Sequence, residues 1–279
     1  MRLHSETRHI ETSAGEMKLI ILHPEKAEGP VPGILWIHGG GYVSGMADMV
    51  YVSRGADAAR RYGAVVVSPE YRLATEAPYP AALEDCYAAL VYLKEHASEL
   101  GVRSDQIMVG GESAGGGLAA AVCMAARDRG EVNVCYQMPL YPMLDCRDTE
   151  SSRNNHGLVW NTPRNHHGWQ TYLGPLFGTE DVPPYASPSR QTDYRGLPPC
   201  YTFVCKGEPF YTETVEFVLQ LQEAGVEATV DEFPGDVHAF DIFLAWTAPG
   251  RQARAAFRQH YRYAAAHYFA PQKEEHHEH

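Results

Sequence analysis

Short apolar runs alternate with longer amphipathic stretches along most of the chain. Residues 64–68, Ala-Val-Val-Val-Ser, form a continuous run rich in β-branched side chains, which is typical of a strand buried on both faces. Residues 80–96 begin with proline and carry Leu83, Tyr87 and Leu90 at helical spacing, so they predict an amphipathic helix. The same reasoning predicts strands at residues 17–22, 33–37, 106–110, 133–138, 201–205 and 227–233, and helices at residues 113–129, 211–224 and 250–269. Alternating strands and helices predict the α/β class, with a mostly parallel central sheet and helices on both faces.

Two segments interrupt this alternation. Residues 145–199 are rich in Asn, His, Trp, Tyr, Gly and Pro and show only a weak helical pattern. A stretch of this length inside a domain favours a lid or a substrate-binding insertion over a plain loop. Residues 271–279 end in Glu-Glu-His-His-Glu-His and predict a disordered tail. The expected organisation is one domain over residues 1–270, with a lid-like insertion at about residues 145–199.

Composition and charge narrow the class of protein. The chain has 279 residues and a formal net charge of −12, which argues against a nucleic-acid partner or a polybasic membrane contact. A hydrophobic content of 44% is enough for a full core, yet no apolar run approaches the roughly 20 residues that span a bilayer. The N-terminal residues show no apolar stretch resembling a secretion signal. Six scattered cysteines without a CxxC pair fit reduced thiols, so a cytoplasmic location is expected.

The string Gly111-Glu112-Ser113-Ala114-Gly115 carries the strongest chemical signal. It lies between a predicted buried strand and a predicted helix of small residues, and this context is that of a nucleophile elbow. The flanking glycines permit the sharp turn that exposes the serine hydroxyl, and the N-terminus of the next helix favours developing negative charge. Ser113 is therefore the predicted nucleophile. The alternative is a glycine-rich helix start with an idle serine.

A second glycine motif, His38-Gly39-Gly40-Gly41-Tyr42, directly follows a predicted strand. Successive glycines expose backbone N–H groups with no side chain in the way, as an oxyanion hole requires. The N–H of the residue after the nucleophile would complete the set of donors. A flexible turn is the alternative, and a phosphate-binding loop fits poorly because the spacing is not GxGxxG. His38 precedes these donors, so we interpret it as a side chain that fixes the loop.

Serine chemistry also needs a base and an acid. Among 14 histidines, His238 comes just after the last predicted strand, where the ligand sites of open α/β sheets collect. The chain order serine, acid, histidine leaves two candidate acids that each follow a strand, Glu208 and Asp145. Glu208 is preferred because one helix and one strand fit between it and His238. A favourable charge at the N-terminus of the following helix is the alternative role for Glu208.

Several separated motifs together resemble the hormone-sensitive-lipase-like esterases, a branch of the α/β-hydrolases. The resemblance implies an α/β-hydrolase sheet, oxyanion donors at Gly40, Gly41 and Ala114, and hydrolysis of short-acyl carboxylic esters without a cofactor or a metal. It also suggests a homodimer. The resemblance covers nearly the whole chain from residue 32 to the last helix. The motifs are the two glycine motifs above, Tyr71-Arg72-Leu73-Ala74 with Pro80-Ala81-Ala82-Leu83-Glu84-Asp85, and His238-Ala239-Phe240.

Three departures from the family pattern change what the resemblance implies for the triad, for Glu112 and for the cap. Glu208 stands before Pro-Phe where the family usually has Asp-Pro-Leu, which implies a Ser–His–Glu triad. Glu112 stands where the family usually has Asp before the serine, and we expect a scaffold role for its carboxylate. Only 37 residues precede His38, so we expect the N-terminal helical cap to be reduced or absent, which leaves residues 145–199 as the lid.

The hypothesis from sequence is a carboxylesterase acting on a small-molecule ester through Ser113, His238 and Glu208. A carbohydrate deacetylase or an amide or formamide hydrolase would use the same groups, whereas a non-catalytic receptor on this fold would not need the base. The polar and aromatic insertion suits a polar alcohol moiety better than a lipid tail, and simple packing over the sheet is the alternative. The candidate substrate contacts are Tyr42, His156, Trp160 and His167.

Overall fold

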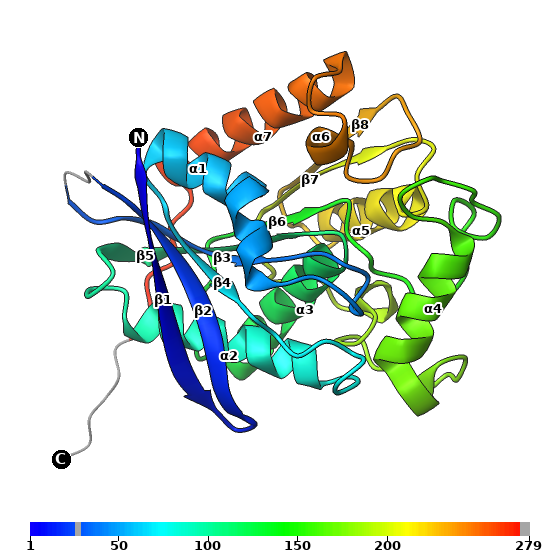
Figure 1. The fold of residues 1–279 in the computed structure, drawn as a ribbon, viewed down its shortest axis with the longest axis horizontal. Coiled ribbons are helices and arrows are strands. Elements are labelled where there is room, and N and C mark those ends of the chain that lie inside the picture. Colours follow the sequence, from blue (N-terminus) through cyan, green and yellow to red (C-terminus); the bar gives the residue numbers. More distant parts are fainter. Residues whose placement is uncertain (26–28, 274–279) are drawn as a thin grey trace.

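One eight-stranded sheet runs through the middle of the molecule (Figure 1). The computed structural model describes residues 1–25 and 29–273. The strands are β1 (Leu3–Thr12), β2 (Gly15–Pro24), β3 (Val31–Ile37), β4 (Val65–Pro69), β5 (Val102–Glu112), β6 (Tyr136–Leu140), β7 (Cys200–Cys205) and β8 (Ala228–Phe233). Their order across the sheet is β1-β2-β4-β3-β5-β6-β7-β8, and all neighbours from β4 to β8 run parallel. The prediction of a mostly parallel α/β sheet is confirmed.

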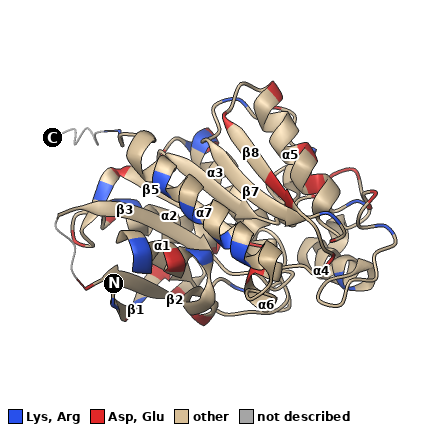
Figure 2. Ribbon diagram, turned by 90° about the horizontal axis from the view of Figure 1, so that it is seen from above, with Lys and Arg blue, Asp and Glu red and all other residues tan. Residues whose placement is uncertain are grey.

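Helices cover both faces of the sheet (Figure 1). Two helices, α1 (Arg54–Tyr62) and α7 (Ala248–His267), lie on one face, where Asp57 of α1 pairs with Arg258 of α7 at 2.6 Å. Figure 2 shows the charged residues of these two neighbouring helices. The other face carries α2 (Ala81–Glu95), α3 (Ala114–Arg129) and α5 (Tyr211–Glu223). The remaining helices are α4 (Thr162–Leu173), α6 (Phe240–Phe243) and the 3₁₀ helices η1 (Ala47–Val52), η2 (Gly174–Leu176) and η3 (Pro188–Arg190).

The continuous apolar runs of the inner strands are explained by these two helical layers. In β4, Val65 and Val67 pack in the apolar cluster with α2 and α3, whereas Val66 packs in the cluster with α1 and α7. Successive strand residues point to opposite faces, so a strand covered on both sides needs apolar side chains at every position. β6 starts later than predicted, at Tyr136, because the N–H of Asn133 donates to the side chain of Gln272 rather than to a neighbouring strand.

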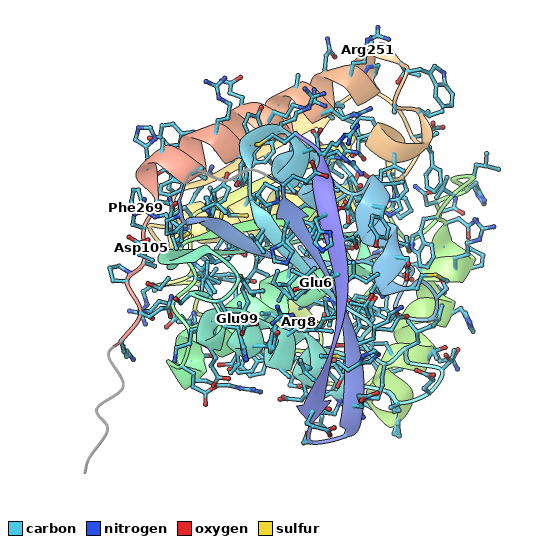
Figure 3. All side chains as sticks on the ribbon, turned by 60° about the vertical axis from the view of Figure 1, so that its left-hand side comes forward. Glu6, Arg8, Glu99, Asp105, Arg251 and Phe269 are labelled. Carbon is cyan, nitrogen blue, oxygen red and sulfur yellow. The ribbon has the colours of Figure 1, made fainter. Side chains whose placement is uncertain are left out.

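β1 and β2 form an antiparallel hairpin at the edge of the sheet, and sequence analysis predicted only β2. Every residue of β1 pairs with β2, from Leu3 opposite Pro24 to Thr12 opposite Gly15. Arg8 of β1 reaches across to Glu99 at 2.6 Å and to the hydroxyl of Tyr92 at 2.8 Å, and Figure 3 shows Arg8 between Glu6 and Glu99. β1 is mostly polar because one of its faces is exposed, so it lacks the apolar run by which the inner strands were found.

The insertion at residues 145–199 lies at the end of the sheet where the loops after the parallel strands gather (Figure 1). It contains α4, a twelve-residue helix with Asn161 as N-cap, whose side chain accepts from the N–H of Arg164. The helical pattern in the sequence is weak because Asn165 and Gly168 occupy two of the buried positions. Tyr172 of α4 stacks on Tyr42 with 3.9 Å between ring centroids, so the insertion packs against the glycine loop.

The segment after α7 contacts the chain before β6, the start of β5 and the end of α3. Residues 271–273, part of the tail predicted to be disordered, make hydrogen bonds: Pro271 accepts from Asn133, Gln272 donates to the carbonyl of Ser104, and Lys273 donates to that of Gly130. Residues 274–279 lie outside the described residues. All six cysteines are free thiols, as expected. Within the described part of the chain, no helix combines the length and apolar character needed to cross a membrane.

Candidate active site

Ser113 occupies the sharp turn between β5 and α3. Its backbone has φ 60° and ψ −121°, a conformation that residues with a Cβ rarely adopt. The first turn of α3 lies very close to the end of β3, because a Cβ on Gly115 would stand 2.2 Å from the carbonyl oxygen of Ile37. Only glycine fits there. The turn is braced from the next strand, since the N–H of Ser113 donates to Leu140 and its carbonyl accepts from Met143.

A hydrogen-bonded chain runs from Ser113 through His238 to Glu208. The Nε2 atom of His238 lies 2.9 Å from the Oγ of Ser113, and its Nδ1 atom is in close contact with the Oε2 of Glu208. The other oxygen of Glu208 accepts from the N–H of Cys205 at 3.0 Å. With a carboxylate at Nδ1, the neutral ring carries its proton on that nitrogen and presents Nε2 as an acceptor to the serine hydroxyl. This polarity allows proton transfer from serine to histidine.

The exposure of the side chains to solvent decreases from Ser113 through His238 to Glu208. The exposed fraction is 8% for Ser113, 4% for His238 and 0% for Glu208, so the serine is the member that can meet a substrate. Edge-to-face ring contacts hold the imidazole on two sides, with centroids 5.1 Å from Tyr141 and 5.0 Å from Phe210. The sequence placed these three residues in one site, and the structure brings them together.

Asp145, the rival acid, has other partners. Both of its carboxylate oxygens accept hydrogen bonds from the guanidinium of Arg147, each at 2.9 Å. Its backbone N–H and that of Leu144 donate to the same oxygen of Glu213, a fully buried carboxylate of α5. Burial raises the pKa of Glu213 well above its usual value. Sequence analysis did not single out Glu213, which fixes the segment after β6 that also braces Ser113.

The glycine loop lies directly beside the nucleophile. A Cβ on Gly39 would stand 3.2 Å from the Cβ of Ser113, and Gly41 has φ 61°. Among the described residues, no acceptor bonds to the N–H groups of Gly40, Gly41 or Ala114. Free N–H groups beside a nucleophilic oxygen are what a developing oxyanion needs, so the geometry is compatible with the predicted donors.

His38 fixes the start of this loop. Its ring stacks on Tyr71 with centroids 4.2 Å apart, its Nδ1 atom bonds to the carbonyl of Gly39 at 2.7 Å, and its own carbonyl accepts from the hydroxyl of Tyr71. Burial lowers the pKa of His38, which favours the neutral ring. These contacts agree with the interpretation of His38 as a loop-fixing residue and not as the base.

The four candidate substrate contacts occupy different environments. Trp160 lies against the glycine loop, because a Cβ on Gly41 would stand 2.1 Å from the outer edge of its indole ring. The indole Nε1 donates to Asn165 at 3.3 Å, and the ring lies 6.3 Å from that of Phe210. His156 is exposed next to Asn155, whose amide donates to the carbonyl of Gly207 beside Glu208. His156 and Trp160 are therefore near the catalytic segments.

Tyr42 and His167 are less suited to contact a substrate. Tyr42 is buried, its hydroxyl donates to the carbonyl of Met143, and its ring is covered by Tyr172. These contacts support the glycine loop, and a direct contact of Tyr42 with the substrate stays a prediction. His167 is exposed on α4, whereas the buried residues of that helix include Trp169 and Tyr172. It lies on the outer face because its position in the helix turns it away from the packed side.

Glu112 has the scaffold contacts expected for it. One carboxylate oxygen accepts from the indole N–H of Trp36 at 2.6 Å, and the other accepts from the N–H of Arg54 at 3.1 Å. Burial raises the pKa of Glu112 to about 7. Among the described residues, no three His, Cys, Asp or Glu side chains are arranged to hold a metal ion.

Comparisons with known proteins identify the family. A family model described as "alpha/beta hydrolase fold" matches residues 34–242, which is most of the chain. The chain belongs to the α/β-hydrolases. The resemblance to the hormone-sensitive-lipase-like branch is confirmed, because relatives and solved structures of that branch match this α/β-hydrolase along most of its length.

Most of the similar proteins are named esterases. Esterase LipI of Mycobacterium tuberculosis is 32% identical over 219 residues, which cover 78% of this chain and 67% of the relative. An acetyl-hydrolase of Streptomyces hygroscopicus is 30% identical over 237 residues, 83% of this chain and 75% of the relative. Among solved structures, a bacterial heroin esterase is 37% identical, with a TM-score of 0.89 over 94% of this chain and 84% of that one. This α/β-hydrolase is a carboxylic ester hydrolase.

Proposed function

We propose that this α/β-hydrolase cleaves short-acyl esters through a Ser113–His238–Glu208 triad and an acyl-enzyme intermediate. The observation that carries the proposal is the continuous hydrogen-bonded chain from the Ser113 hydroxyl to the buried Glu208 carboxylate. Neither a receptor nor a structural protein needs a serine aligned on a histidine at 2.9 Å. The homodimer and the cytoplasmic location stay predictions.

The reaction follows from the polarity of these groups. His238 Nε2 takes the proton of Ser113 as Oγ bonds to the ester carbonyl carbon, and Glu208 stabilises the imidazolium that forms. The carbonyl oxygen becomes negative and accepts hydrogen bonds from the N–H groups of Gly40, Gly41 and Ala114. His238 then gives the proton to the departing alcohol, which leaves the acyl group on Ser113. Water repeats the sequence with His238 as base, and it releases the carboxylic acid and restores the serine.

Trp160 supports the preference for a short acyl group. Its indole lies on the glycine loop, so it occupies space beside the proposed position of the ester carbonyl. A long acyl chain gains about 0.8 kcal/mol for each CH₂ group that it buries, and a rigid ring held by Asn165 limits the room for such burial. One of the similar proteins is named an acetyl-hydrolase, which favours the same substrate class.

A hydrolysis panel tests the proposed function. We expect 4-nitrophenyl acetate and butanoate to be cleaved with a higher kcat/KM than the octanoate ester, since that ratio reports differential binding of the transition state. Acetylated sugars and acetanilides form the other two arms. Faster turnover of acetylated sugars than of the aryl esters would reassign the enzyme as a carbohydrate deacetylase, and faster turnover of the anilides would reassign it as an amide hydrolase. A steady rise from acetate to octanoate would refute the short-acyl preference.

A further inference from the structure

Backbone strain is concentrated around the proposed catalytic groups. Within the described residues, four non-glycine residues have a positive φ angle: Tyr42, Ser113, Tyr141 and Ala239. Tyr42 ends the glycine loop, Tyr141 packs on the His238 ring, and Ala239 directly follows that histidine. Side chains with a Cβ rarely take this conformation, and it persists only where the surroundings hold it. The segments next to Ser113 and Ala239 therefore need firm attachment.

Arg54, the first residue of α1, touches both segments. Its backbone N–H donates to Glu112, the residue before Ser113, at 3.1 Å. The Nε atom of its guanidinium lies 3.0 Å from the carboxylate of Asp241, three residues after His238. These groups are enclosed, because Arg54 is 4% exposed and Asp241 is 0% exposed. A single buried residue thus lies between the end of the nucleophile strand and the loop that carries the base.

Glu112 extends this connection to the glycine loop. The carboxylate of Glu112 accepts from the indole N–H of Trp36 at 2.6 Å, and Trp36 comes two residues before His38. All three catalytic segments therefore meet behind the triad: the nucleophile turn through Glu112, the oxyanion loop through Trp36 and the base loop through Asp241. Arg54 contacts two of these three segments directly and the third through Glu112.

Charge gives the side chain of Arg54 a specific role in this group. Glu112 and Asp241 are both buried, and burial raises the pKa of each carboxyl. Arg54 is the guanidinium in contact with Asp241, while Arg254 of α7 and the hydroxyl of Tyr141 also face that carboxylate. A buried carboxylate that loses its cation is strongly destabilised. The charge of Arg54 opposes the rise in the pKa of Asp241 and attracts its carboxyl group, so Arg54 holds in place the helix α6 that begins just after Ala239.

We propose that Arg54 is a positioning residue that fixes the nucleophile turn at Ser113 relative to the loop that carries His238. The inference rests on the proposed roles of Ser113 and His238. Without the guanidinium, Asp241 and the loop that carries His238 would shift relative to Ser113. A displacement of about 1 Å between reacting groups can lower turnover on the order of 10²-fold even when the substrate still binds. The signature is therefore a loss in kcat with little change in KM.

The test compares five variants with the parent enzyme for kcat and KM on 4-nitrophenyl acetate and for the melting temperature Tm. Arg54→Gln removes the charge, Arg54→Lys retains it, and Asp241→Asn removes its partner. The double variant Arg54→Gln/Asp241→Asn replaces the Arg54–Asp241 ion pair by a neutral amide pair. Arg61→Gln is the matched control, because Arg61 also lies on α1 and pairs with Asp57 at 2.9 Å, but it contacts none of the catalytic segments.

We expect Arg54→Gln to lower kcat on the order of 10²-fold with KM nearly unchanged, and Arg54→Lys to recover part of that loss. In the double variant, Tm returns toward the parent value because the unpaired charge of Asp241 is gone. Its kcat stays low, because the loop that carries His238 is still displaced relative to Ser113. If Arg54→Gln does not fold, the kcat and Tm of the double variant decide the outcome. Arg61→Gln keeps the parent kcat.

Two results would overturn the inference. One is an Arg54→Gln enzyme with kcat within about twofold of the parent. The other is a double variant in which kcat recovers together with Tm, since Arg54 would then serve stability alone. Failure of the proposed function is a separate result: in that case Ser113→Ala remains active, whatever the Arg54 variants do.

Discussion

The imidazole of His238 lies 2.9 Å from the hydroxyl of Ser113, although 125 positions separate the two residues along the chain. The contact exists because β5 and β8 run parallel and both end at the same edge of the sheet. Loops that follow parallel strands meet there, so residues from distant parts of the sequence can form one site.

Replacing Ser113 by alanine removes the proposed nucleophile. We expect turnover to fall on the order of 10⁶-fold, the scale known for removing a triad serine, with the fold retained. An organophosphonate should label the parent on Ser113 and leave the variant unlabelled, which mass spectrometry of the peptides checks. Modification of a different serine in the parent enzyme would contradict the assignment.

Glu208→Gln and Asp145→Asn separate the two candidate acids. The first removes the charge that stabilises the His238 imidazolium, so kcat should fall by roughly 10⁴-fold, the reference case for a triad carboxylate made neutral. The second removes only the partner of Arg147 and should change kcat little. Both variants are compared by kcat and by Tm. The opposite pattern would transfer the acid role to Asp145.

Trp160→Ala tests what limits the acyl group. Removing the indole from the glycine loop should raise the octanoate-to-acetate ratio of kcat/KM by at least tenfold, which corresponds to burying about two more CH₂ groups. Leu158→Ala is the matched control because this side chain lies in the same segment but is 84% exposed. A ratio that rises equally in both variants would show that the whole segment, and not Trp160, sets the preference.

The ionisation of Glu112 should make stability depend on pH. Burial raises its pKa from 4.5 to about 7, so the folded protein holds this proton more tightly than the unfolded chain. Stability from this group is therefore greatest below pH 4.5 and declines as the pH rises to about 7, on the order of 3 kcal/mol in all. Asp241 and Glu213 contribute with the same sign, because burial raises their pKa values as well.

Glu112→Gln isolates this contribution. The difference in free energy of unfolding between variant and parent should shift in favour of the variant as the pH rises from 5 to 8, as urea denaturation measures. Glu150→Gln is the control, since Glu150 is exposed. A difference that stays constant over this range would mean that Glu112 is already ionised at pH 5.

Much of the fold was predictable because its signals are local. The run at residues 64–68 is apolar at every position since β4 is covered on both faces, and the Gly-x-Ser-x-Gly string lies at the strand–helix junction that its small residues require. Chain order and position after a strand then pointed to Glu208 and His238. Three of the elements that the sequence did not reveal share a common reason. β1, α1 and α4 carry many polar residues, and their apolar faces are too narrow to stand out before the packing partner is known.

The sequence by itself determined the α/β class, the glycine loop, the nucleophile turn and the order of the three catalytic candidates, because each depends on residues that are neighbours in the chain. Only the tertiary structure placed Glu208 beside His238 and Asp145 beside Arg147, put Trp160 on Gly41 and stacked Tyr42 on Tyr172. It also joined Glu112 of β5 to Asp241 of α6 through Arg54 of α1. These relationships depend on which strands lie side by side and which side chains share a buried space. Hydrophobic periodicity records that a residue is buried, and not which residue it is buried against.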